Sequence, residues 1–432
     1  MSNFRLPRYN GEGWAWLNEL RNAAIERFAS VGYPDLREDE HWRWTQLGAL
    51  PQTAFRPAQR AEISPDVIAP YSFGTEAAVE LVFVNGFYAP GLSKIDALPR
   101  GARVVNWQSA GAADEDLIQR HLGRYSKVED NPFVALNTGS AQDGVLIHLA
   151  RGVALDRPVH VLHVNTGGAD PVVTHPRMLI VLEENAEAQV AHTYAGAGEG
   201  TYFTNTVSEV VVGDSARLEY CKLQHESLSA YHIGTTQAQV GRSGVFVSHQ
   251  ASLGSLVTRN DVNAVMAGDG AEATLNGLTI IGGRQHVDNH TLLDHAQPNC
   301  PTHELYKAVL DGHSSSVFKG QILVRPGSLN TDSKQTSRTL LLADTASMNA
   351  QPALEIYADD VKCTHGSTTG PLDEEQVFYL QSRGLHLEAA RHLLTYAFAA
   401  DITGRIRTQP VRRYLEEYMA AQHGLPKDLR IQ

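Results

Sequence analysis

Short apolar runs separated by small polar residues dominate the chain between about residues 78 and 360. The runs ELVFVNG, VHVLHV and MLIVLEEN are rich in Val, Ile and Leu, and Gly, Asp, Asn and Ser lie between such runs. This texture is typical of strands of about five residues that are joined by tight turns. Strong helical periodicity is missing over this range, so the pattern predicts a mainly β core rather than alternating strands and helices.

One turn pattern recurs along the predicted β core. An apolar strand end is followed by one or two small polar residues, then a small residue, and then alternation resumes. The small residues are separated by 30, 28, 27, 44 and 31 positions, and they are Ala186, Ala216, Gly244, Ala271, Ser315 and Ala346. A quasi-period of about 30 residues favours the stacked coils of a β-solenoid, with an insertion in the fourth step. A sandwich or barrel with similar turns is the alternative.

The segment before the β core has helical spacing and then a tryptophan-containing stretch. Apolar residues recur at helical intervals from Gly13 to Ser30, and Gly32 stands where a helix-ending glycine is expected. The following sequence REDEHWRWTQL is expected to be ordered and to pack the indoles of Trp42 and Trp44 on a larger body. We therefore assign residues 1–75 to an N-terminal helical region and residues 76–366 to the β core.

The chain becomes helical again after Gly370. Asp373 and Gln376 resemble a capping box, and Gly384 is expected to end the first helix. Two further apolar stripes at helical spacing follow, so residues 367–432 are predicted to form three amphipathic helices. Their apolar faces must cover either the end of the solenoid or a partner.

Charge and cysteine content narrow the class of protein. The 432 residues contain 36 Lys and Arg against 48 Asp and Glu, which gives a formal net charge of −12 with no basic block. Such a surface makes nucleic acid and membrane surfaces poor partners. Three widely spaced cysteines suit a reducing compartment. The first residues show no signal peptide and no run is long enough to span a membrane, so we expect a soluble cytoplasmic protein.

Several enzyme signatures are absent from the sequence. The Gly-rich GAGEG at 196–200 lacks the lysine and the spacing of a phosphate-binding loop. There is also no H-E-x-x-H, no paired C-x-x-C and no G-x-S-x-G motif. A solitary NTPase or hydrolase is therefore disfavoured.

The densest group of histidines is His286, His290, His295 and His303. On a strand, the first two share a face but are about 13 Å apart, which is too far for one metal ion. Structural or interface roles are one interpretation. The other is a stand-alone β-helix metalloenzyme that uses these histidines with zinc or iron.

A second candidate site is the Cys-x-His pair in the stretch DDVKCTHGSTTG, residues 359–370. If this stretch is extended, Cys363 and His365 point the same way with Cα atoms about 6.6 Å apart. Two ligands do not complete a tetrahedral site, so the pair is either structural or half of a site that another subunit finishes. A soft sulfur beside an imidazole suits iron–sulfur chemistry or zinc.

Long stretches of the chain resemble one family. LEIYADDVKCTHGSTTGPLDEEQVFYLQSRGL (354–385) resembles the SufB/SufD family of iron–sulfur cluster assembly scaffolds, and the sequence from HVDNHTLLDH to SMNAQP is similar to the same family. The REDEHWRWTQL segment also looks like an N-terminal motif of that family. The form K-C-x-H-G, the length and the short N-terminal region favour the SufD branch.

The resemblance carries specific implications. It implies a right-handed parallel β-helix with flanking helical regions, and a non-catalytic scaffold that pairs with a SufB-type subunit and a SufC-type ATPase. The C-terminal helices would dock SufC, and ATP hydrolysis would belong to SufC. Cys363 and His365 would lie at the SufB–SufD junction as tentative, shared metal ligands. An iron–sulfur cluster would be present only transiently in the complex, with no cofactor in the isolated chain, which could form a homodimer.

Overall fold

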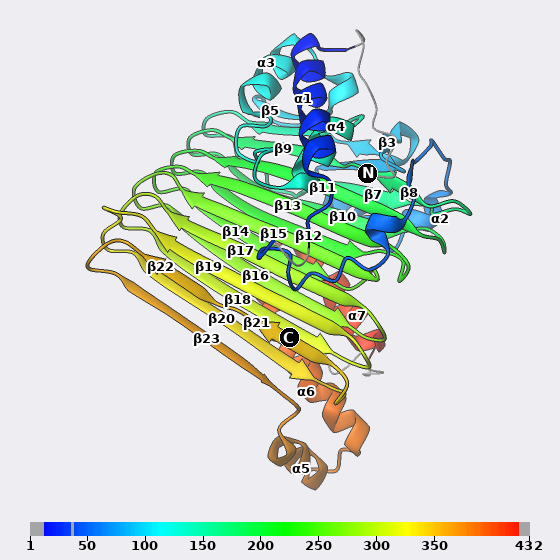
Figure 1. Cartoon of the computed structure of the whole chain (residues 1–432), viewed down its shortest axis with the longest axis vertical. Coiled ribbons are helices and arrows are strands. Elements are labelled where there is room, and N and C mark those ends of the chain that lie inside the picture. Colours follow the sequence, from blue (N-terminus) through cyan, green and yellow to red (C-terminus); the bar gives the residue numbers. More distant parts are fainter. Residues whose placement is uncertain (1–12, 36–38, 423–432) are drawn as a thin grey trace.

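Successive strands alternate between two facing sheets in a computed structural model that describes residues 13–35 and 39–422 (Figure 1). Each coil contributes one strand to each sheet, and strands of neighbouring coils pair in parallel. The predicted β-solenoid is therefore confirmed, and the sandwich or barrel alternative is wrong. Expectations about the first twelve residues lie outside the described part of the chain.

The first sheet contains twelve strands within the described residues. They are β1 (Arg56–Pro57), β5 (Ala102–Asn106), β6 (Val145–Leu149), β8 (Val172–Thr174), β9 (Arg177–Leu182), β11 (Tyr202–Val212), β13 (Tyr231–Val240), β15 (Val257–Met266), β17 (His286–His295), β19 (Ser315–Val324), β21 (Ser347–Ala350) and β22 (Ala353–Ile356).

The second sheet contains eleven strands over the same described ranges. They are β2 (Val79–Val84), β3 (Phe87–Tyr88), β4 (Lys94–Ile95), β7 (Val159–Asn165), β10 (Glu187–Gly196), β12 (Arg217–His225), β14 (Val245–Ser252), β16 (Glu272–Ile281), β18 (Pro301–Leu310), β20 (Asp332–Leu341) and β23 (Lys362–Gly370).

The α-helices lie before, within and after the strands. They are α1 (Ala15–Val31), α2 (Pro65–Ile68), α3 (Ala112–His121), α4 (Pro132–Ser140), α5 (Glu374–Ser382), α6 (Leu387–Thr403) and α7 (Gln409–Gln422). Short 3-10 segments are present at Leu50–Gln52, Gly74–Glu76, Pro90–Leu92 and Trp107–Ser109. No helix of the described residues is long and apolar enough to cross a membrane.

A row of left-handed turn residues sets the start of each second-sheet strand from β10 to β23. The row consists of Asn185, Ser215, Ser243, Gly270, Asn299, Asn330 and Asp360, each with positive φ. Short polar residues and glycine tolerate this conformation best. Successive turns are also hydrogen-bonded, since the N–H of Ser215 donates to the Arg242 carbonyl and that of Ser243 to the Asp269 carbonyl. The row therefore holds the coils in register.

This turn row corrects the predicted repeat. Ala271 aligns with Cys300, 29 positions later, because their neighbours Ala273 and Thr302 are paired. Ser315 and Ala346 belong instead to the starts of first-sheet strands, since Ser315 is the first residue of β19 and Ala346 directly precedes β21. The predicted insertion in the fourth step is thus wrong, since the 44-residue step joins one turn row to the other. The turn before β18 was missed because Cys300 stands there in place of the usual Ala or Gly.

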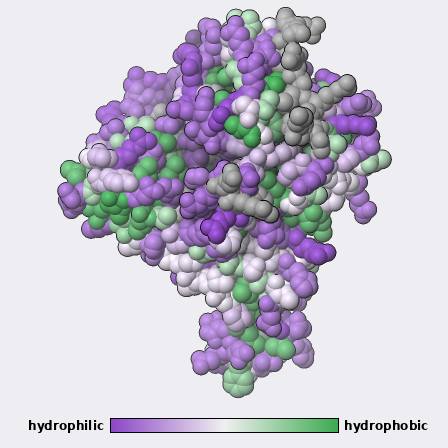
Figure 2. Space-filling model, in the orientation of Figure 1, coloured by the Kyte–Doolittle hydropathy of each residue, from purple (hydrophilic) through white to green (hydrophobic). Residues whose placement is uncertain are grey.

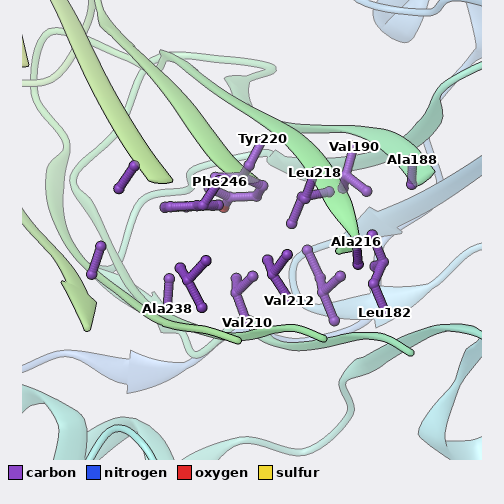
Figure 3. Packing of buried hydrophobic residues seen from close by; sticks show 14 of the residues in the cluster. Leu182, Ala188, Val190, Val210, Val212, Ala216, Leu218, Tyr220, Ala238 and Phe246 are labelled. Atoms are coloured by element: carbon purple, nitrogen blue, oxygen red, sulfur yellow. The ribbon is translucent and has the colours of Figure 1, made fainter. Parts of the chain in front are cut away.

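Apolar side chains fill much of the space between the two sheets. Val190 and Leu218 of the second sheet face Val210 and Val212 of the first, and aromatic rings such as Phe246 fill the wider parts (Figure 3). Full burial of an aliphatic or aromatic side chain of this size contributes about 1.5–3 kcal/mol. The interior between the sheets is therefore the main hydrophobic core.

Helices cover the outer face of each sheet. The α1, α3 and α4 helices pack on the first sheet near its N-terminal end, and α6 and α7 pack on the second sheet (Figure 1). The α3 and α4 helices correct the expectation of a helix-free range from 78 to 360. The α4 helix is buried on nearly all sides, so its sequence shows no amphipathic period, although Asn131 accepts from the Phe133 N–H as an N-cap and Pro132 occupies the first turn.

The predicted terminal helices are present at both ends. The N–H of Gly32 donates to the Phe28 carbonyl at the end of α1, and the Asp373 carboxylate accepts from the Glu375 and Gln376 N–H groups at the start of α5. Gly384 follows α5 with φ +95°. The division at residues 75 and 366 stays a prediction.

One of the two expected indoles is buried. Trp42 is 3% exposed, stacks beneath the Arg259 guanidinium and contacts the Phe133 ring. Trp44 is 44% exposed, so the expectation of packing is wrong for this residue. The first two residues of REDEHWRWTQL lie outside the described ranges. The REDEHWRWTQL segment is anchored by a buried network, in which Thr45 and Arg259 both donate hydrogen bonds to Asp288.

Candidate functional site at the open end

The C-terminal end of the solenoid leaves strand edges without a neighbour. Within the described strands, β23 pairs only with β20, and β21 and β22 pair only with β19. None of these three strands contains a fully buried residue, in contrast to the strands of the preceding coils. We call β21–β23 the open end. Ile356, the last residue of β22, is 40% exposed, and Tyr357, directly after it, is 62% exposed.

The strand geometry of Cys363 and His365 agrees with the prediction. Both lie on β23, where they pair with Ser333 and Gln335 of β20 and share the face that points between the sheets. Cys363 packs against the interior core, whereas His365 is exposed at the edge. The chain therefore places a thiol and an imidazole on one face of an unpaired strand.

Only one of the three free cysteines, all within the described residues, is accessible. Cys221 and Cys300 are buried, and burial raises the pKa of both thiols. Cys363 is partly buried, which raises its pKa as well, although a hydrogen bond from the Ser333 backbone lowers it. The isolated chain thus holds Cys363 mainly as a thiol at neutral pH.

The four histidines between 286 and 303 do not form one site. His286 and His290 lie on the outer face of β17, where His286 bonds Ser315 and His290 pairs with Asp288. His295 points to the interior from the same strand, where its Nε2 lies 3.1 Å from the Thr302 Oγ1. His303 lies on the outer face of β18 in the other sheet. In the described ranges, no group of three or more His, Cys, Asp and Glu is placed to hold a metal ion.

Two interior rows of polar residues lead to the open end, and no motif in the sequence marks them. The cysteine row is Thr302, Ser333 and Cys363, and the histidine row is Glu304, Gln335 and His365. The Thr302 and Ser333 hydroxyls are 2.7 Å apart, and Gln335 Nε2 donates to Glu304 Oε2 over 2.7 Å.

Glu304, the carboxyl group of the histidine row, has a shifted pKa. Burial raises the pKa of Glu304 to about 7, although the hydrogen bond from Gln335 lowers it. The rows become visible in the sequence only after positions about 30 residues apart are aligned, which requires the correct turn row.

A second exposed apolar surface lies on and after α5. Phe378, Tyr379 and Leu387 are 71%, 57% and 45% exposed, and no residue of α5 is buried. We call these three residues the α5 patch. The helix projects beyond the open end, and Figure 2 shows apolar surface on this projection. Contiguous exposed apolar surface of this kind is typical of interaction sites.

Family comparisons match almost the whole chain. Residues 163–398 match the model of the SufBD core domain of SUF-system iron–sulfur cluster assembly, and residues 9–161 match the SufBD N-terminal region. This chain belongs to the SufBD family. The family is a component of iron–sulfur cluster assembly in the SUF system.

Relatives of this SufBD-family chain are similar along most of their length. A SufBD family protein of Synechocystis is 32% identical, with 89% of this chain and 86% of the relative covered. The SufD protein of Escherichia coli is 30% identical over 90% and 89% of the two chains. The SufD protein of Bacillus subtilis is 24% identical over 93% and 92%. The resemblance seen in the sequence motifs is thus confirmed.

Proposed function

We propose that this chain is a non-catalytic scaffold subunit of iron–sulfur cluster assembly, which pairs with a SufB-type subunit through the open end. The single observation that carries the proposal is the position of Cys363 and His365 on the inward face of an unpaired edge strand. An edge strand offers backbone donors and acceptors that a strand of another chain can pair. The partner would then bring its own ligands to the same place.

The chemistry of the pair fits a shared site for a cluster that is built and passed on. A thiolate and an imidazole are ligands that suit iron, and two of them leave coordination positions for a second protein. The partner's arrival also dehydrates the pair. We propose that the cluster is cargo, which is held only while both subunits are joined.

The α5 patch supports a second contact, with a SufC-type ATPase. The patch lies at the C-terminal side of β23, so a partner that binds it sits beside the open end. Movement of that partner during ATP hydrolysis could then act on the junction. The relatives named SufD and the family assignment support this arrangement.

Substitution of His365 tests the proposal. We expect His365→Ala to reduce cluster assembly by the purified three-protein complex at least tenfold, because a ligand is lost from the shared site. Cys363→Ser should have a smaller or comparable effect. Cluster formation is followed by absorbance under nitrogen with iron and a sulfide source.

Thr364→Ser serves as the matched control, because Thr364 lies between the two residues and faces the opposite side of β23. Size-exclusion chromatography and melting curves establish that each variant folds and joins the complex. Normal assembly rates for His365→Ala in an intact complex would mean that Cys363 and His365 have only a structural role.

A further inference from the structure

Only the NH2 end of the Gln335 amide has a hydrogen-bond partner among the described residues. Its side chain is 1% exposed, and Nε2 donates to Glu304 Oε2, but the carbonyl oxygen Oε1 has no hydrogen-bond partner among the described residues. A buried polar atom without a partner destabilises the folded state. Such an atom beside a candidate site requires an explanation.

The strand register places that amide directly next to His365. Gln335 and His365 are paired on neighbouring parallel strands, which lie about 4.8 Å apart, and both side chains are on the inward face. Gln335 precedes His365 in the stack and Glu304 precedes Gln335. The histidine row is therefore a carboxyl, an amide and an imidazole in sequence.

The opposite sheet leaves room for this arrangement. Gly320 of β19 faces the Gln335 amide, and a Cβ at this position would clash with Gln335 Nε2 and with the Phe318 ring. A larger residue would thus displace the amide from Glu304. The absence of a side chain at this point makes the close approach of Gln335 possible.

We propose that Gln335 is a positioning residue for His365, and that Glu304 fixes the orientation of its amide. Because Glu304 takes the NH2 end, the carbonyl end remains as an acceptor. Gln335 Oε1 and His365 are not hydrogen-bonded in the structure, and rotation of the exposed imidazole would bring one ring N–H to that oxygen. That hydrogen bond selects the tautomer of His365 and leaves the other ring nitrogen free to bind metal. Ligating histidines usually have such a partner on the second nitrogen.

The orientation of His365 by Gln335 is inferred from the strand geometry, whereas its effect on cluster assembly also rests on the proposed function. Two measurements therefore test these two parts separately. The first is the tautomer of His365 in the isolated full chain, measured by nitrogen-15 NMR of labelled histidine side chains, with His365→Ala identifying the signals. The second is cluster assembly by the complex.

We expect one dominant His365 tautomer in the wild type and a mixture in Gln335→Met, which keeps the side-chain length and removes the amide. Glu304→Gln keeps an acceptor for the amide and should preserve the tautomer, whereas Glu304→Met should not. Assembly should slow about tenfold in Gln335→Met, as is common when a ligand's supporting partner is lost. Lys334→Met, on the outer face of the same strand, is the matched control.

The outcomes are distinct. A His365 tautomer that is unaffected by both Gln335→Met and Glu304→Met overturns the positioning role, whatever happens to assembly. An altered tautomer with unchanged assembly overturns the functional part of the inference. Loss of assembly in Lys334→Met to the same degree as in Gln335→Met would also overturn it, because a general defect would then explain both. If Gln335→Met does not fold, the Glu304 pair provides the same comparison.

Discussion

At the scale of single residues, Cys363 differs from the other two thiols in its access to solvent. Cys221 lies beneath α6 and α7 and Cys300 lies in the interior core, whereas Cys363 lies at the edge of the open end. The motif K-C-x-H-G identified Cys363 and His365 from sequence alone. Gln335 and Glu304 could not be identified in that way, because their relation to His365 depends on strand pairing across about 30 residues.

We expect alkylation of the native isolated chain by iodoacetamide to label Cys363 alone. Partial burial raises the pKa of this thiol, so the rate should reach half its maximum at a pH above that of an exposed cysteine, about 8.5. The sign follows because only the thiolate reacts, and a raised pKa reduces the thiolate at any given pH. Mass spectrometry over a pH series measures both site and rate. Labelling of Cys221 under native conditions, or a lower midpoint, would contradict this.

At the scale of elements, the three C-terminal helices have two different roles. Tyr396 of α6 and Leu415 of α7 belong to a buried cluster with Leu223 and Leu278 of the second sheet. The start of α7 is also anchored, since the N–H and hydroxyl of Thr408, the residue directly before the helix, donate to Glu219. In contrast, α5 contacts α6 but contains no buried residue. Removal of everything after Thr369 would therefore expose the second sheet as well as remove the docking helix.

Substitution within α5 is the more specific test of SufC docking. We expect Phe378→Ala to weaken binding of a SufC-type ATPase by more than about tenfold, since exposed aromatic residues at the centre of a patch often dominate the binding energy. The melting temperature should stay unchanged, because Phe378 is 71% exposed. Ile95→Ala is the matched control, because Ile95 is 53% exposed on β4 at the opposite, N-terminal end of the second sheet. Calorimetric titration with equal affinity for wild type and Phe378→Ala would exclude this docking surface.

At the scale of the whole molecule, the solenoid interior holds buried polar side chains as well as the apolar core. Turn chemistry at residues such as Asn185 and Ser215 was enough to predict stacked coils. The polar part of the interior was not predictable, because His163, His192 and His295 look like ordinary strand residues until both sheets are placed around them.

These buried histidines predict acid sensitivity. Burial lowers the pKa of His163 to about 3 and of His295 to about 4, and that of His192 also lies well below its usual range. The unfolded chain takes up these protons near pH 6.5, so the stabilisation is complete above pH 6.5 and is lost as pH falls toward 4. Each pKa unit corresponds to about 1.4 kcal/mol.

Melting temperatures between pH 7.5 and 4.5 should therefore fall steeply below pH 6.5. His295→Gln should reduce the slope, and His303→Ala, on an outer face, should leave it unchanged. A flat profile over this range would show that the interior histidines do not govern acid stability.

The two ends of the solenoid differ, and this difference limits how many copies can join. At the N-terminal end the parallel ladder stops in antiparallel pairs, where β2 meets β3 and β4, and β5 meets β6. A coil with two unpaired ends could add subunits without limit and grow into a filament. Within the described residues of this chain, only the β21–β23 end presents an edge of the parallel ladder, so we expect an assembly that extends the parallel sheets through β23 to be complete after a single addition, whether the added chain is a relative or a second copy.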